Sequence, residues 1–107
     1  MDNKLEQSCF EIISYAGGSK ALFLEAADLA LEFRFDEALA KVKEGKELLK
    51  QAHKIHAELI TMDVRGELPK IPLLLIHAED QFMSSEDSQT LAQKTIKIMK
   101  VIEQKLK

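Results

Sequence analysis

The sequence predicts an all-α protein, folded as an antiparallel bundle of three long helices. Apolar residues recur at steps of three and four along most of the chain, which is the spacing of one face of an α-helix. Both prolines fall in one short segment, and no stretch shows strand alternation or a hairpin dipeptide. A chain of 107 residues fits one domain, residues 1–107.

The first helix is expected over about residues 3–33. Its apolar face consists of Leu5, Cys9, Ile12, Ile13, Ala16, either Leu22 or Phe23, Ala26, Leu29, Ala30 and Phe33. Gly17 and Gly18 interrupt this face, and each glycine costs about 1 kcal/mol against alanine in a helix interior. We interpret the pair as a close helix crossing or a slight kink, and a break into two helices is the alternative.

The second helix is expected over about residues 36–65. Asp36 can accept hydrogen bonds from the free amides of the first turn, and Glu37 adds charge that favours the positive end of the helix dipole. The connection between the first two helices is short, so they should be antiparallel neighbours.

The third helix is expected over about residues 73–105, after a loop at 66–72 that contains Pro69 and Pro72. Helices near 30 residues long would be roughly 45 Å in length. Three such rods enclose a thin core, so we expect apolar surface to remain on at least one helix and to drive self-association.

Composition and charge exclude several classes of function. The net charge is −3, with 15 basic and 18 acidic residues, and aromatic residues make up only 6%, so we expect no nucleic-acid binding. No apolar run approaches the roughly 20 residues that span a bilayer, so we expect no membrane insertion. The N-terminus lacks the apolar region of a signal peptide, and the single cysteine excludes an internal disulfide. These features favour the cytoplasm.

Three polar residues at the start of the third helix are the main candidates for chemistry. His77, Asp80 and Gln81 stand at i, i+3 and i+4 and therefore project from one side of the helix. The spacing allows three interpretations: a hydrogen bond between His77 and Asp80, a shared metal site completed by other helices or chains, or a nucleophilic imidazole. It does not choose among them.

Other residues carry weaker signals. His53 and His56 stand at i, i+3 on the second helix, where a structural or solvent-facing role is expected. Cys9 lies on the apolar face of the first helix and is expected to be a small buried hydrophobe.

Four segments resemble one known family. Residues 77–83 read His-Ala-Glu-Asp-Gln-Phe-Met, which is similar to the active-site motif of the lactose/cellobiose family of enzyme IIA proteins of the bacterial sugar phosphotransferase system. Residues 12–18, 35–38 and 51–56 resemble further segments of that family, in the same order and spacing. Two positions depart from the motif: Glu79 replaces the usual Gln, and Gln81 replaces a residue that is often His.

The resemblance implies a phosphoryl carrier that forms a homotrimer of three-helix bundles. His77 would accept a phosphoryl group from the phosphorylated carrier protein HPr. It would pass the group to a cysteine of the cognate enzyme IIB, for uptake of a β-linked disaccharide of the lactose or cellobiose type. Asp80 would face the trimer axis, where three copies hold a divalent metal ion, expected to be Mg²⁺. The alternative is a non-catalytic helical adaptor or regulatory module that keeps the bundle without phosphotransfer.

Overall fold

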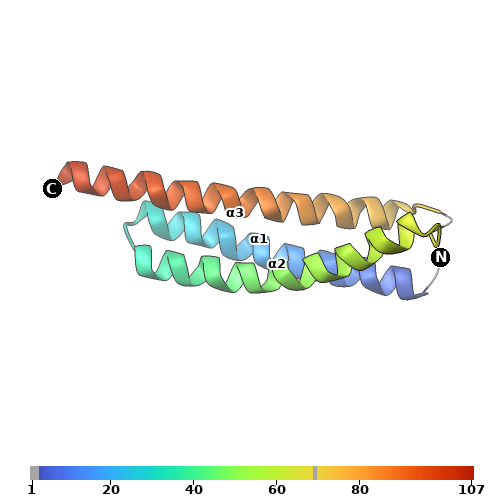
Figure 1. Cartoon of the computed structure of the whole chain (residues 1–107). Coiled ribbons are helices and arrows are strands. Elements are labelled where there is room, and N and C mark those ends of the chain that lie inside the picture. Colours follow the sequence, from blue (N-terminus) through green and yellow to red (C-terminus); the bar gives the residue numbers. More distant parts are fainter. Residues whose placement is uncertain (1–2, 69) are drawn as a thin grey trace.

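The computed structural model describes residues 3–68 and 70–107, and Pro69 of the predicted loop lies outside them. Three helices follow one another as an antiparallel bundle, which confirms the predicted fold class (Figure 1). They are α1 (Asn3–Leu31), α2 (Phe35–Val64) and α3 (Leu73–Leu106), and each end lies within two residues of the prediction. The described residues contain no strand.

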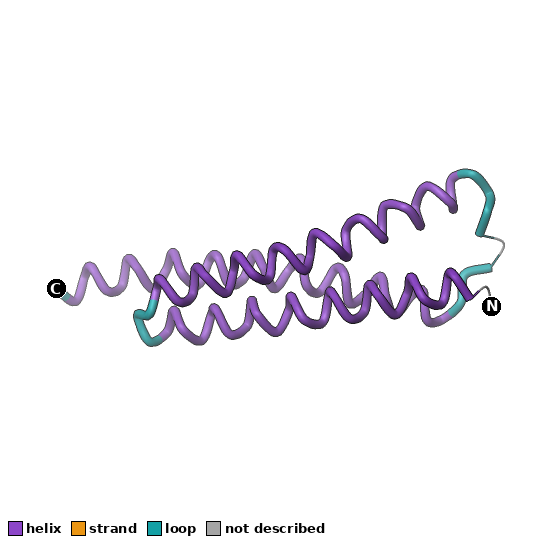
Figure 2. The backbone as a smooth tube through the Cα atoms, turned by 90° about the horizontal axis from the view of Figure 1, so that it is seen from below, coloured by secondary structure: helices purple, strands orange, loops and turns teal. Residues whose placement is uncertain are grey.

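The bundle is long and thin, with extents of 59 × 19 × 18 Å. Helix α1 packs along both other helices, whereas α2 and α3 contact each other much less. Figure 2 shows α2 diverging from α1 toward its C-terminal end, and the C-terminal end of α3 extends beyond the turn between α1 and α2 (Figure 1). Grooves can therefore form where α2 leaves its neighbours.

The core runs along the shared faces of the helices and closes most tightly around Phe23. The Phe23 ring is fully buried and lies against Gly45 of α2, where a methyl group in place of a glycine hydrogen would stand 2.5 Å from a ring carbon. Ser19 of α1 and Ser85 of α3 are also fully buried, and their hydroxyl groups hydrogen-bond to each other. At this level of the core, one large aromatic ring therefore faces a residue with no side chain.

Helix α1 runs through Gly17 and Gly18 without a break, so the two-helix alternative is wrong. A Cβ atom on Gly18 would lie 3.1 Å from a methyl carbon of Leu48, so Gly18 marks a close approach between α1 and α2. A Cβ atom on Gly17 would have no neighbouring atom within 4 Å. The expected close helix crossing is therefore present at one of the two glycines.

Both α1 and α2 end in the same hydrogen-bonded turn. At the end of α1, the amide of Arg34 donates to Leu29 O and the amide of Phe33 donates to Ala30 O. The N···O distance is 3.0 Å in both hydrogen bonds. Phe33 has a φ of 60°, the left-handed conformation that this type of helix end requires and that glycine usually supplies. Glycine does supply it at the end of α2, where Gly66 has a φ of 74°.

The expected capping role of Asp36 is wrong. Helix α2 begins one residue earlier than predicted, at Phe35, and its N-cap is Arg34, which makes no side-chain capping bond. Asp36 therefore lies inside the first turn, where its charge still favours the helix dipole. The Arg34 guanidinium instead donates to the Glu37 carboxylate.

Apolar surface remains on the outer side of α3, as expected for so thin a bundle. The exposed apolar residues that follow this side of the helix are Leu73, Ile76, Met83, Leu91, Ile98, Val101 and Ile102. We call this set the α3 stripe. Its exposure is consistent with self-association, because burial of apolar area is the main driving force of stable association.

Two glycines make a matched test of the core. We expect Gly45→Ala to lower the free energy of unfolding by about 1–3 kcal/mol, because its methyl group would overlap the Phe23 ring. Gly17→Ala should raise it by about 0.5–1 kcal/mol, because the position is helical and open. Urea unfolding followed by circular dichroism measures both, and equal effects at the two positions would contradict this packing.

Candidate functional site

His77 lies in the second turn of α3, on the side of the helix that faces solvent. Pro72, with φ −72° and ψ 158°, is extended and serves as the N-cap, so the helix begins directly after it. The imidazole of His77 is exposed and makes no hydrogen bond or ion pair with any described residue. Helical side chains lean toward the N-terminus, so the ring lies over the first turn of α3.

Asp80 follows one turn later on the same side and is also exposed. Within residues 3–68 and 70–107, neither Asp80 nor Gln81 forms a hydrogen bond with His77, so the first of the three interpretations, a local hydrogen bond between His77 and Asp80, does not describe this structure. Ile76 and Met83, which flank Asp80 along the helix, are 48% and 51% exposed. The carboxylate therefore lies within the apolar α3 stripe.

Glu79 points to a different neighbour. Its carboxylate lies 2.6 Å from Nε2 of His56 on α2, and both side chains are partly buried. The His56 ring also stacks on the buried Phe82, with 4.5 Å between ring centroids. A structural or solvent-facing role was expected for His56, and its contact with Glu79 and Phe82 shows that it has a structural role, as a link between α2 and α3.

A groove adjoins this pair where α2, the loop and the start of α3 meet. It encloses about 270 Å³ and is lined mainly by apolar side chains, with His56 and Glu79 among its few polar residues. Ile76 lines the groove and also belongs to the α3 stripe. His77 is therefore next to a residue that borders two apolar surfaces.

Cys9 is not a candidate nucleophile. Burial raises the pKa of its thiol above the ordinary value of 9.0, and the negative charges of Glu79 and Glu6 raise it further. The thiol therefore stays protonated near neutral pH, as expected for a buried cysteine that acts as a small hydrophobe.

The described part of a single chain does not form a metal site. No three His, Cys, Asp or Glu side chains among those residues gather closely enough to hold an ion. A site at Asp80 would need carboxylates from other copies of the chain. Among the same residues, no helix is both long and apolar enough to cross a membrane.

Comparison with known proteins identifies the family. Residues 7–100 match the family model described as PTS system, Lactose/Cellobiose specific IIA subunit. The lichenan-specific phosphotransferase enzyme IIA component of Bacillus subtilis is 31% identical over 106 residues, which cover 98% of this chain and 96% of that protein. The lactose-specific EIIA component of Staphylococcus epidermidis is 34% identical over 76 residues, covering 71% of this chain and 73% of that protein.

A solved structure agrees with these matches. The cellobiose-specific enzyme IIA of Bacillus anthracis superimposes with a TM-score of 0.92 and 33% identity, covering 98% of this chain and 96% of that one. The class of protein is therefore the enzyme IIA component of the sugar phosphotransferase system. Within this class, the chain belongs to the lactose/cellobiose-specific family.

The contact between α2 and α3 can be tested through His56. We expect His56→Ala to lower the free energy of unfolding by about 2 kcal/mol, because it removes the stacking on Phe82 and leaves the Glu79 carboxylate without its partner. Glu79→Gln should lower the free energy of unfolding by less than His56→Ala does, because the amide oxygen of the new side chain can still accept a hydrogen bond from His56. Lys54 is exposed on the same helix and provides a control. The free energy of unfolding of Lys54→Ala should stay within about 0.5 kcal/mol of the wild-type value.

Thermal and urea unfolding would measure these differences. A His56→Ala protein as stable as the Lys54→Ala control would show that the contact adds nothing to the bundle.

Proposed function

We propose that this enzyme IIA accepts a phosphoryl group from phosphorylated HPr on His77 and passes it to a cysteine of its cognate enzyme IIB. The observation that carries the proposal is the exposed, unpartnered imidazole of His77 in a segment that resembles the family's active-site motif. Both partners must reach the same atom in turn, and a ring on an outer helix face allows two proteins to approach it.

The chemistry requires only an available imidazole nitrogen. The nitrogen lone pair attacks phosphorus and forms a P–N bond while the bond from phosphorus to the donor breaks. In the second half-reaction, a thiolate of enzyme IIB attacks the same phosphorus, and the P–N bond breaks to regenerate His77. Positioning and charge stabilisation supply most of the catalysis in phosphoryl transfer.

The dipole of α3 favours a phosphorylated His77, and the Asp80 carboxylate on the same side opposes it unless the cation proposed below neutralises that charge. The first turn of α3 has no acidic residue, so nothing offsets the positive end of its dipole beneath the leaning ring. Glu79 would add negative charge, but residues two apart on a helix point in nearly opposite directions. Its carboxylate contacts His56 on α2 instead. This geometry supports phosphotransfer in spite of the departure from the usual Gln.

We further propose that the protein is a homotrimer in which the α3 stripes of three copies meet around Asp80. The exposed apolar residues of the stripe and the position of Asp80 between Ile76 and Met83 support this arrangement. Three Asp80 side chains would hold a divalent cation, for which we propose Mg²⁺. The cation would neutralise the repulsion between the carboxylates.

The relatives also guide the choice of sugar. Their names include lichenan, lactose and cellobiose, so we propose that the associated transporter takes up a β-linked sugar of this kind. We also propose a cytoplasmic location, where the protein would meet HPr and enzyme IIB.

Phosphorylation at His77 is directly testable. Phosphoenolpyruvate, enzyme I and HPr should label the wild type, and His77→Ala should abolish the label, because the accepting nitrogen is removed. His53→Ala is the matched control on α2 and should be labelled as fully as wild type. Incorporation of ³²P measures the label, and circular dichroism checks that helicity is unchanged.

Two results would contradict the assignment. Label that persists in His77→Ala would place the phosphate elsewhere. A well-folded wild-type protein that takes up no label would instead support the adaptor role.

The proposed metal predicts the behaviour of the assembly. We expect a chelator to lower the stability or the mass of the wild-type trimer in sedimentation, because the Asp80 carboxylates would then repel one another. Asp80→Leu should form a trimer that is insensitive to chelator and at least as stable, because the like charges are gone. Asp28→Leu, an exposed carboxylate on α1, should keep the wild-type response. A monomer under all conditions would overturn both the trimer and the metal.

A further inference from the structure

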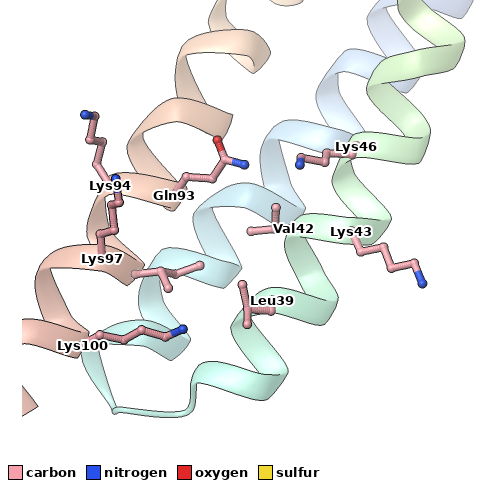
Figure 3. A pocket seen from close by; sticks show the side chains of 9 residues that line it. Leu39, Val42, Lys43, Lys46, Gln93, Lys94, Lys97 and Lys100 are labelled. Atoms are coloured by element: carbon pink, nitrogen blue, oxygen red, sulfur yellow. The ribbon is translucent and has the colours of Figure 1, made fainter.

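A second groove lies between α2 and α3 at the opposite end of the bundle from His77 (Figure 3). It encloses about 620 Å³ and has an apolar floor formed by Leu39, Val42 and Ile96. Its rims carry lysines from both helices: Lys43 and Lys46 on α2, and Lys94, Lys97 and Lys100 on α3. We call this feature the lysine groove.

The charge of the lysine groove is opposite to that of the whole protein. The chain has a net charge of −3, yet five lysines and no carboxylate line this one groove. None of the five lysines forms an ion pair with a described residue. The nearby Lys41 does, since its Nζ lies 3.5 Å from Oε1 of Glu25. Lys100 Nζ lies 5.8 Å above the centroid of the Phe35 ring, a contact that leaves its charge in place. The groove therefore presents positive charge that no carboxylate of the described chain pairs with.

The shape of the groove favours an extended ligand over a compact anion. The lysines are spaced three residues apart along the helices, so their charges follow two lines along the rims. Figure 3 shows the side chains of Lys46 and Lys100 extending over the groove, whereas those of Lys43 and Lys94 point away from it. A single phosphate would need donors that converge on one point, and the rims do not provide them.

The packing of the bundle indicates what kind of extended ligand fits. Because α2 and α3 contact each other little, a fourth helix laid between them would complete a four-helix arrangement. An amphipathic helix buries its apolar stripe in such a groove and places its polar flanks at the rims. Here those flanks would have to be acidic to complement the lysines.

We propose that the lysine groove binds an acidic amphipathic helix of a partner protein. The helix would place its apolar stripe on the exposed Leu39 and on the exposed edges of the largely buried Val42 and Ile96, and its carboxylates along the two lysine rims. Residues 93–100 lie at least 16 positions after His77, which is about 24 Å along α3. The partner would therefore leave His77 uncovered, and this inference is independent of the proposed phosphotransfer.

The test uses the full chain and a synthetic helical peptide of about 18 residues, with leucines at i, i+3, i+4 and i+7 and glutamates on the flanks. We expect saturable binding by fluorescence anisotropy that weakens as salt increases. A peptide of the same composition with scrambled order should bind at least tenfold more weakly. Lys97→Glu with Lys100→Glu should reduce binding of the ordered peptide at least tenfold.

A matched variant controls for net charge. Lys50→Glu with Lys105→Glu makes the same change in charge at exposed positions outside the groove, and it should bind like wild type. Equal losses in the two double variants, or equal binding of the scrambled peptide, would overturn the proposal. So would anionic phospholipid vesicles that outcompete the ordered peptide on the wild type. A change in oligomeric mass confined to the groove variant would also overturn it, because a second copy would then cover the groove.

Discussion

The bundle is so thin that each helix can bury only part of its circumference. Three helices in a cross-section of 19 × 18 Å can bury only one side of α3, mostly against α1. The opposite side must face solvent or another molecule, whatever residues it carries. In this chain that side carries His77, Asp80 and the apolar α3 stripe, so the same constraint creates the candidate site and the surface available for assembly.

The side chains of residues 77–83 therefore point in three different directions. Ala78 and Phe82 point into the core, His77 and Asp80 point outward, and Glu79 reaches sideways to His56. Phe82 joins the inward and sideways groups, because the His56 ring stacks on it. The buried residues thus fix the rotation of α3 about its axis and, with it, the direction in which the His77 ring faces.

Helical periodicity and the two prolines sufficed to predict the three helices, and family resemblance identified the exposed histidine segment. The sequence alone could not predict the left-handed backbone conformation of Phe33, because a bulky residue rarely replaces glycine at the C-terminal end of a helix. The pairing of His56 with Glu79 joins positions 23 residues apart and depends on how two helices rotate against each other. The lysine groove could not be predicted either, because its two rims come from different helices. Each rim alone resembles a solvated helix face.

Phosphotransfer through this chain requires, in our proposal, that the exposed ring of His77 carries the phosphoryl group. Peptide mapping of the phosphorylated protein by mass spectrometry under neutral conditions would locate that group. We expect one acid-labile phosphate, on the peptide that contains His77 and no other histidine. An acid-stable phosphate, or one on a peptide that contains His53 or His56, would contradict it.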